Sequence, residues 1–203
     1  MLEKDTYKTI STASNETLFK DKNSKFYGYA YPINSTDEVK LILKHLKKQH
    51  HAARHWCYAY VLGTKTKTHR VNDDGEPGNT AGMPIYRQIQ SFNLTNTLVV
   101  VVRYFGGVKL GVSGLINAYK NSALITLQSC NITENTININ YAITFNYDSM
   151  NKVMQIVKEK RLHIINQKFE ISCYLEISVR EKDAKTVFNI FNNLYLVNIK
   201  ELV

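Results

Sequence analysis

Apolar residues in the first two thirds of the chain alternate between strand and helix patterns. Residues 26–33 and 55–63 are rich in aromatic and β-branched residues, which favours strands, and residues 96–105 are apolar on both faces, which predicts a central strand. A helix capped by Ser35 or Thr36 is expected to follow the first strand, with one apolar face formed by Val39, Ile42, Leu43 and Leu46. A long packed helix is expected from Leu110, with its buried face formed by Leu115, Ile116, Tyr119, Ala123 and Leu127.

Residues 68–84, between the second and third of these strands, read THRVNDDGEPGNTAGMP. Polar and turn-forming residues dominate this stretch, so it is expected to be a long exposed loop.

The pattern changes near residue 135. We expect strands at 135–147, 163–167, 169–179 and 195–202, and helices at 148–162 and 181–194. The resulting order β-α-β-β-α-β is that of a ferredoxin-like split βαβ unit. The sequence therefore predicts an α+β protein with an N-terminal α/β domain at residues 1–138 and a ferredoxin-like domain at residues 139–203.

The charge balance is basic. The chain carries a formal net charge of +9, and residues 1–140 hold 17 Lys+Arg against 10 Asp+Glu. A basic surface of this kind favours polyanionic partners such as RNA or the ribosome, although solvated lysines are the plain alternative.

Membrane and disulfide-stabilised classes do not fit the sequence. No apolar run approaches the ~18 residues of a membrane span, and the polar start MLEKDTYKTI is unlike a signal peptide. The three cysteines are scattered, which indicates a reduced, cytoplasmic protein rather than a disulfide framework.

A glycine-rich loop joins the valine strand to the long helix, in the stretch VVVVRYFGGVKLGVSGL. The amide groups of a helix N-terminus attract anions, and glycine lets a phosphate approach closely. Arg103 and Lys109 bracket the loop, and Ser113 is expected either to cap the helix or to contact an anion. The predicted cradle thus comprises Arg103, Gly106, Gly107, Lys109, Gly111, Ser113 and Gly114. Alternatively, the glycines serve only the turn and close helix packing.

Two other clusters have candidate chemistry. Asp73, Asp74 and Glu76 could hold Mg²⁺ with its waters, although the same residues are ordinary turn formers. A zinc site is the weaker interpretation of His51, His55, Cys57 and His69, because their spacing matches no established zinc module. A basic helix end suited to a phosphate backbone is the better interpretation, and it includes Lys47, Lys48, His50, His51 and Arg54.

These same motifs resemble the signature of the YigZ/IMPACT family. The matching residues are Asp73 to Pro77, Thr80 to Gly82, Pro84, Arg103 to Gly107, Lys109 to Gly111 and Gly114, together with Ser24-Lys25-Phe26 and Ala53-x-His55-x-Cys57. Val112-Ser113 departs from the usual Thr-Gly, and Asn79 is an altered neighbour of Thr80. Lys25, Arg54, His55 and Thr80 complete the predicted set of phosphate or nucleic-acid contacts.

The resemblance implies an N-terminal domain similar to domain 2 of ribosomal protein S5, and a C-terminal domain similar to the last domain of elongation factor G. It also implies a link to translation, because eukaryotic relatives regulate translation under amino-acid starvation through a further partner-binding domain.

We therefore expect a non-catalytic RNA- or ribosome-binding protein that modulates translation, with no cofactor and with a protein partner in translation control as a further expectation. One alternative is an enzyme that binds a phosphorylated or nucleotide substrate, with Mg²⁺ at the acidic loop and His55 as acid or base. The other alternative is a protein-interaction module with purely structural glycines.

Overall fold

The computed structural model describes residues 5–170 and 172–202. The chain divides into two compact units. Residues 7–135 form the N-terminal unit, and residues 136–202 form the C-terminal unit, which Asp5 and Thr6 also join. Each unit is described by itself.

The N-terminal unit is built on a five-stranded antiparallel sheet with the strand order β2-β3-β6-β4-β5. The strands span Thr17–Asp21 (β2), Ser24–Pro32 (β3), His55–Leu62 (β4), Thr68–Asn72 (β5) and Thr97–Tyr104 (β6). The valine run lies in β6, where every residue except Tyr104 is buried. The prediction of a central strand over this run is confirmed.

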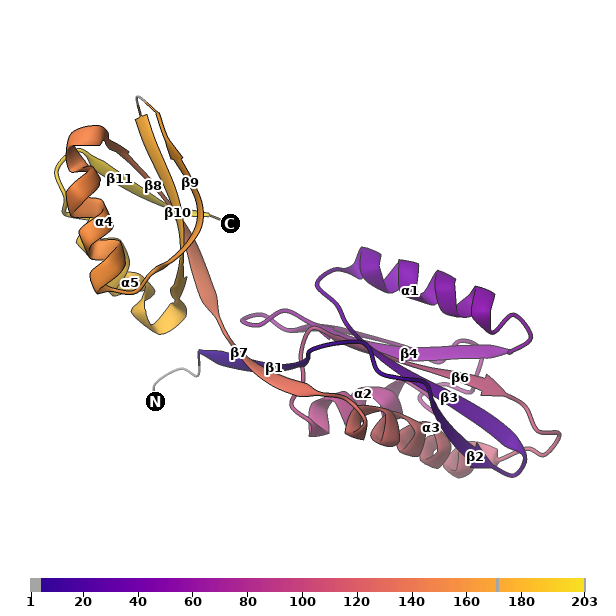
Figure 1. Ribbon diagram of the computed structural model, residues 1–203. Helices are drawn as coiled ribbons and strands as arrows, with labels where there is room; N and C mark the ends of the chain where they lie inside the picture. Colours follow the sequence, from indigo (N-terminus) through magenta and orange to yellow (C-terminus); the bar gives the residue numbers. More distant parts are fainter. Residues whose placement is uncertain (1–4, 171, 203) are drawn as a thin grey trace. The chain divides into compact units, whose positions relative to one another are not determined.

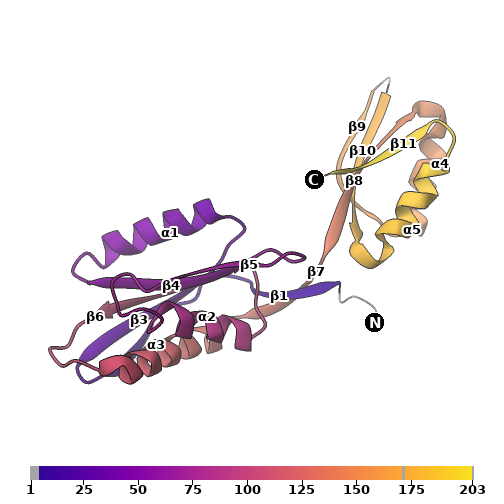
Figure 2. The same cartoon turned by 180° about the vertical axis from the view of Figure 1, so that it is seen from behind.

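Helices cover both faces of this sheet. Helix α1 (Thr36–Gln49) lies on one face, and α2 (Gly82–Ser91) and α3 (Gly111–Gln128) lie on the other (Figures 1 and 2). Each face has its own core, because alternate residues of a strand point to opposite sides. In β6, Val99 and Val101 pack toward α2 and α3, whereas Val100 and Val102 pack toward α1.

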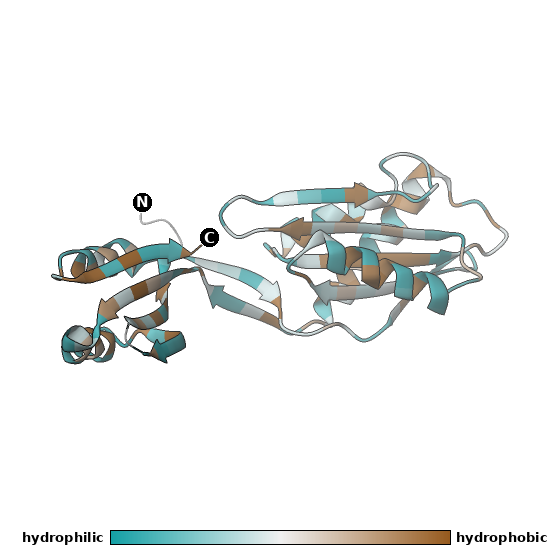
Figure 3. Cartoon of the chain, turned by 90° about the horizontal axis from the view of Figure 1, so that it is seen from above, coloured by the Kyte–Doolittle hydropathy of each residue, from teal (hydrophilic) through white to brown (hydrophobic). Residues whose placement is uncertain are grey.

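Helix α1 begins as its sequence predicts. The Ser35 hydroxyl accepts a hydrogen bond from the Glu38 amide at 3.3 Å, and the Glu38 carboxylate accepts one from the Asn34 amide at 3.0 Å, which is close to a capping box. Hydrophobic and hydrophilic residues are interspersed along the helix (Figure 3). Val39 and Leu46 are buried against the sheet, while the lysines are exposed.

The prediction of one continuous exposed loop over residues 68–84 is wrong. Residues Thr68–Asn72 form the edge strand β5, and α2 begins at Gly82. Helix α2 was missed because the residue at its cap position, Ala81, has no side chain that accepts a hydrogen bond, so the local sequence lacks a start signal. Its Ile85 and Ile89 are fully buried, so tertiary packing stabilises it.

The C-terminal unit has the predicted element order β-α-β-β-α-β. Its elements are Asn138–Asn146 (β8), Met150–Glu159 (α4), His163–Phe169 (β9), Ser172–Arg180 (β10), Glu181–Asn192 (α5) and Val197–Leu202 (β11). The sheet order is β11-β8-β10-β9, and both helices lie on one face of the sheet (Figure 1). The similarity of the N-terminal unit to domain 2 of ribosomal protein S5 remains a prediction. The similarity of the C-terminal unit to a ferredoxin-like domain also remains a prediction.

Two further short strands complete the structure, and neither they nor β2 were predicted from the sequence. Strand β1 (Thr6–Ile10) pairs with β7 (Ile132–Thr136) in a two-stranded sheet. No helix among the described residues combines the length and the apolar character that crossing a membrane requires. All three cysteines are unpaired.

Candidate nucleic-acid interface

Arg103, near the end of β6, points toward the α2–α3 face of the sheet and is 5% exposed. Its Nη1 donates a hydrogen bond to Glu76 Oε1 at 2.7 Å, and its guanidinium lies 5.5 Å from the ring centre of Phe26. The next residue, Tyr104, points to the α1 face and contacts Tyr27 and His50. The charge that ends the apolar strand is therefore compensated inside the protein.

A buried polar network extends from this ion pair. The Tyr119 hydroxyl donates to Glu76 Oε1 at 2.8 Å, and Cys57 Sγ lies 3.3 Å from the same hydroxyl. Burial raises the pKa of the Cys57 thiol and that of the Tyr119 hydroxyl well above their ordinary values. Both groups are consequently protonated at neutral pH, and neither is an activated nucleophile.

The acidic loop is held by its own hydrogen bonds. The Asp73 carboxylate accepts hydrogen bonds from the amides of Asn79, Ala81 and Gly82 at 2.8–2.9 Å, and so satisfies the start of α2. The Asp74 carboxylate accepts one from the Trp56 amide at 2.8 Å.

Each of the three acids of this loop thus has a protein partner. In residues 5–170 and 172–202, no group of three His, Cys, Asp or Glu side chains is arranged to hold a metal ion. His55 Nδ1 instead lies 2.8 Å from the carbonyl oxygen of Asp74, and His69 stacks on Tyr86 with ring centres 4.4 Å apart.

The glycines between β6 and α3 have different roles. A side chain at Gly106 would place its Cβ 2.1 Å from the Asn23 carbonyl carbon, so this glycine permits close backbone packing. Gly107 and Gly111 have φ values of +87° and +73°, which favour glycine, and space is open around both. Gly114 packs closely against Leu110.

A pocket of about 350 Å³ lies at the start of α3. Arg103, Lys109 and Gly111 line it together with Glu76 and Phe105. The pocket therefore brings together three residues of the predicted phosphate cradle. The charge of Arg103, however, is already paired with Glu76.

The other predicted contacts lie outside the lining of this pocket. Ser113 is exposed and is not the helix cap, because α3 is preceded by Leu110 at the cap position without a side-chain bond. Thr80 is buried, and its hydroxyl donates to the Pro77 carbonyl at 2.6 Å. Lys25 and Arg54 are exposed. Strand alternation places Lys25, the neighbour of the core residue Phe26, on the α1 face.

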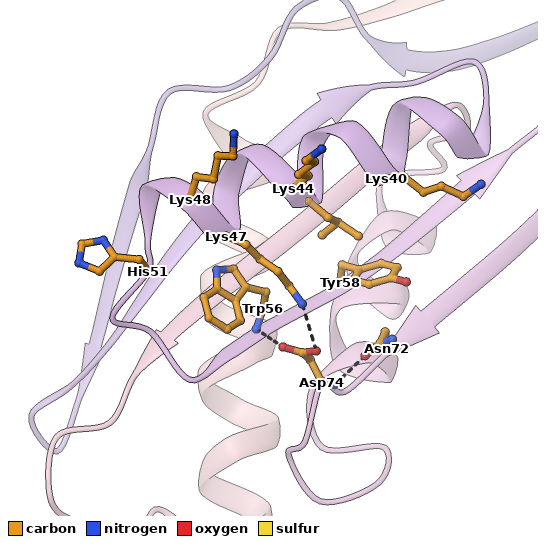
Figure 4. Close-up of a pocket in the computed structure, with 10 residues that line it drawn as sticks. Lys40, Lys44, Lys47, Lys48, His51, Trp56, Tyr58, Asn72 and Asp74 are labelled. Atoms are coloured by element: carbon orange, nitrogen blue, oxygen red, sulfur yellow. Dashed lines mark hydrogen bonds and ion pairs between the residues drawn. The ribbon is translucent and has the colours of Figure 1, made fainter.

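A larger groove, of about 700 Å³, runs between α1 and the strands β4 and β5 (Figure 4). Basic side chains from α1 and the residues after it form one wall, namely Lys40, Lys44, Lys47, Lys48 and His51. Trp56 and Tyr58 of β4 form the floor, and Asp74 stands at the opposite side. Cations beside aromatic rings are the groups that bind phosphates and bases in nucleic-acid interfaces.

Sequence reasoning found only part of this groove. It identified the basic end of α1, but it missed Lys40 and Lys44, and it took Trp56 and Tyr58 only as strand residues. The signal was present, because Lys40, Lys44 and Lys48 recur every four residues on a helix, and Trp56 and Tyr58 share one face of a strand.

Buried hydrogen bonds hold the end of α1 beside this groove. Nε2 of His50 lies 2.5 Å from the Tyr29 hydroxyl, and its Nδ1 lies 3.1 Å from the Tyr104 hydroxyl. Tyr29 also donates to Glu16. Burial lowers the pKa of His50, against an opposing effect of Glu16. The imidazole is therefore a neutral link between the helix end and the sheet.

Comparison with solved structures shows that the fold is known. A protein described as "Crystal structure of an hypothetical protein" aligns with a TM-score of 0.74 and 21% identity, over 98% of both chains. At this identity the likeness shows the fold alone.

Sequence comparison is more specific. The family model described as "Impact N-terminal domain" matches residues 22–127. The chain is 31% identical to "IMPACT family member YvyE" of Bacillus subtilis (strain 168) over 88% of this chain and 82% of that protein. It is 27% identical to "IMPACT family member YigZ" of Escherichia coli (strain K12) over 89% and 92%. The resemblance predicted from the acidic loop and the glycine motif is confirmed, and the chain belongs to the IMPACT family.

Proposed function

We propose that this protein binds RNA without catalysing a reaction and that it modulates translation through that binding. The α1 groove of the N-terminal unit is the contact surface. The translational setting rests on the family resemblance, whereas the RNA contact rests on the geometry of the groove.

The observation that carries the proposal is the row of lysines along α1. Lys44 and Lys48 are exposed on the groove wall, and within residues 5–170 and 172–202 neither makes an ion pair. Lys40 is paired with Asp37 at 2.8 Å, but both side chains are largely exposed, so this pair is weak and exchangeable. A row of lysines in which Lys44 and Lys48 are unpaired and Lys40 is weakly paired, beside an aromatic floor, favours a phosphate backbone over a neutral ligand.

The polar groups of the N-terminal unit that could take part in catalysis are buried or already hydrogen-bonded, which favours a binding role over a catalytic one. The buried thiol of Cys57 and the hydroxyl of Tyr119 have raised pKa values, and the acids of the loop each have a protein partner. The smaller pocket at Lys109 remains a second place where a phosphate group could bind.

The test is binding of fluorescently labelled RNA over a series of salt concentrations, together with co-sedimentation with ribosomes. We expect affinity to fall steeply with salt, because each phosphate neutralised by the protein contributes about 0.7 to the slope for a single strand. Lys44→Glu and Lys48→Glu should weaken binding strongly. Lys120→Glu is the matched control, because it makes the same charge change on an exposed position of α3.

Salt-insensitive binding, or equal loss in Lys44→Glu and Lys120→Glu, would contradict the proposal. A selective loss in a Lys109→Glu variant would move the contact to the pocket at the start of α3. Binding to a protein partner but to no RNA would favour the interaction-module alternative.

A further inference from the structure

We infer that the α1 groove binds single-stranded RNA, with an unpaired base stacked on Trp56 and the neighbouring phosphates on the lysines of α1. This inference rests on the proposed RNA binding and adds the class of RNA and the residue that receives the base.

The indole of Trp56 forms part of the groove floor and is partly exposed. Its backbone amide is fixed by the hydrogen bond to Asp74 Oδ2 at 2.8 Å, so the residue is held in place where β4 meets the acidic loop. An aromatic ring on an anchored backbone in a basic groove suits base stacking, because every base has a π face.

Lys47 occupies the place that a base would take. Its Nζ lies 5.2 Å from the centre of the Trp56 ring and 3.9 Å from Asp74 Oδ1 (Figure 4). The Lys47 side chain is 53% exposed, and an ion pair at that distance in water contributes little. When RNA binds, Lys47 can therefore leave the Trp56 ring to the base and move to a phosphate. The phosphate then compensates the charge of the lysine in place of Asp74.

The indole N–H of Trp56 gives a second, independent reason. Its Nε1 is buried and makes no hydrogen bond to any described residue. A buried donor without a partner is unfavourable, and a small rotation of the ring toward a phosphate or base oxygen in the groove would satisfy it.

The aromatic floor of the groove favours a single strand over a duplex. Lys40, Lys44 and Lys48 are four residues apart, which corresponds to about 6 Å along the helix axis, so they form a row of charges that can follow a phosphate backbone. In a duplex the bases are paired and stacked, so none can reach the floor of the groove.

The experiment uses the fact that Trp56 is the only tryptophan in the chain. Tryptophan fluorescence is followed during titration with an unstructured RNA oligonucleotide, with the same strand annealed to its complement, and with oligoglutamate. We expect strong quenching by the single-stranded RNA and much less by the duplex. A single-stranded DNA of the same sequence shows whether the 2′-hydroxyl contributes.

Variants separate stacking from charge. Trp56→Leu should weaken binding of labelled single-stranded RNA by about tenfold with little change in the salt slope, and Trp56→Phe should restore most of the loss. Lys44→Ala should lower the salt slope by about 0.7. Tyr195→Leu is the aromatic control, because Tyr195 is 86% exposed and lies in the other unit. Circular dichroism verifies that each variant folds.

The outcomes distinguish this inference from the proposed function. Salt-dependent RNA binding without quenching, and unaffected by Trp56→Leu, overturns the inference and leaves the proposed function standing. Equal affinity for duplex and single strand also overturns it. The absence of any nucleic-acid binding overturns both, and quenching by oligoglutamate alone assigns the groove to an acidic peptide.

Discussion

Arg103 and Glu76 form an ion pair with 2.7 Å between Nη1 and Oε1, and their side chains are only 6% and 4% exposed. The pair joins the end of the central strand to the acidic loop. It explains, in physical terms, why a charged residue can end a strand that is otherwise apolar: the positive charge is compensated by a carboxylate, and two aromatic rings, Phe26 and Phe105, lie within 5.6 Å of the guanidinium.

Removing one partner of this pair is expected to be costly. Glu76→Gln leaves the buried arginine without its counter-charge, and we expect the free energy of unfolding to fall by about 3–5 kcal/mol. Urea denaturation measures this change. The double variant Glu76→Leu with Arg103→Met should recover part of the loss, because it removes both buried charges. The account would be contradicted if the double variant lost as much free energy of unfolding as Glu76→Leu and Arg103→Met lose together when each is made alone.

The two adjacent glycines of the loop should differ in their tolerance of alanine. Gly106→Ala brings a Cβ to 2.1 Å from the backbone at Asn23, so the loop or the β2–β3 turn must shift. Gly107→Ala meets no neighbour, and its cost is that of a positive φ, about 1–2 kcal/mol. We expect a larger fall in Tm for Gly106→Ala, and equal falls would show that close packing is not the constraint there.

Asp73 is expected to stabilise the loop independently of any metal. Asp73→Ala removes the acceptor of three backbone amides, and we expect a loss of about 1–3 kcal/mol in the free energy of unfolding. Thermal unfolding with and without Mg²⁺ tests the alternative. A rise in Tm with Mg²⁺ that disappears in Asp74→Asn would instead support the metal site predicted from the sequence.

The buried His50 predicts a pH dependence of stability. Burial lowers its pKa in the folded state below the ordinary value of 6.5, so the unfolded chain takes up the proton first as the pH falls. The contribution of the neutral imidazole is therefore fully present above about pH 6.5 and is lost as the pH falls from there through the folded-state pKa. Tyr27, Tyr29, Tyr104 and Glu16 surround the ring, and Glu16 partly offsets the effect.

Urea denaturation between pH 5 and pH 8 measures this dependence. His50→Gln should flatten the curve of stability against pH in the acidic range. His45→Gln, at an exposed position of the same helix, is the matched control and should leave the curve unchanged. An identical curve for wild type and His50→Gln would show that the imidazole does not titrate differently on folding.

The sequence predicted elements well where one pattern was strong. The valine strand and the striped helix α1 have clear periods, and the element order of the C-terminal unit follows directly from alternating residues such as those of β10. Helix α2 and strand β5 were missed, because turn residues dominate the segment between them and burial of Ile85 and Ile89 supplies the stability that no local signal indicates.

The site was harder to predict because pairing across the fold decides which charges are available. Arg103 and Lys44 look equally basic in the sequence. In the structure the first is buried against Glu76, and the second is exposed in the α1 groove. The partner of Arg103 is 27 residues away, and no local pattern indicates that contact.

The alternation of β6 limits how the chain can vary in length. Val101 and Arg103 point to one side of the sheet, and Val102 and Tyr104 point to the other. A single inserted or deleted residue within the strand would exchange these sides. It would drive the Arg103 guanidinium into the aromatic layer beneath α1 and leave the buried Glu76 carboxylate without its counter-charge. Insertions and deletions among homologous chains should consequently be confined to the exposed connections. The length of the central strand should not vary, because it sets which residues face each side of the sheet.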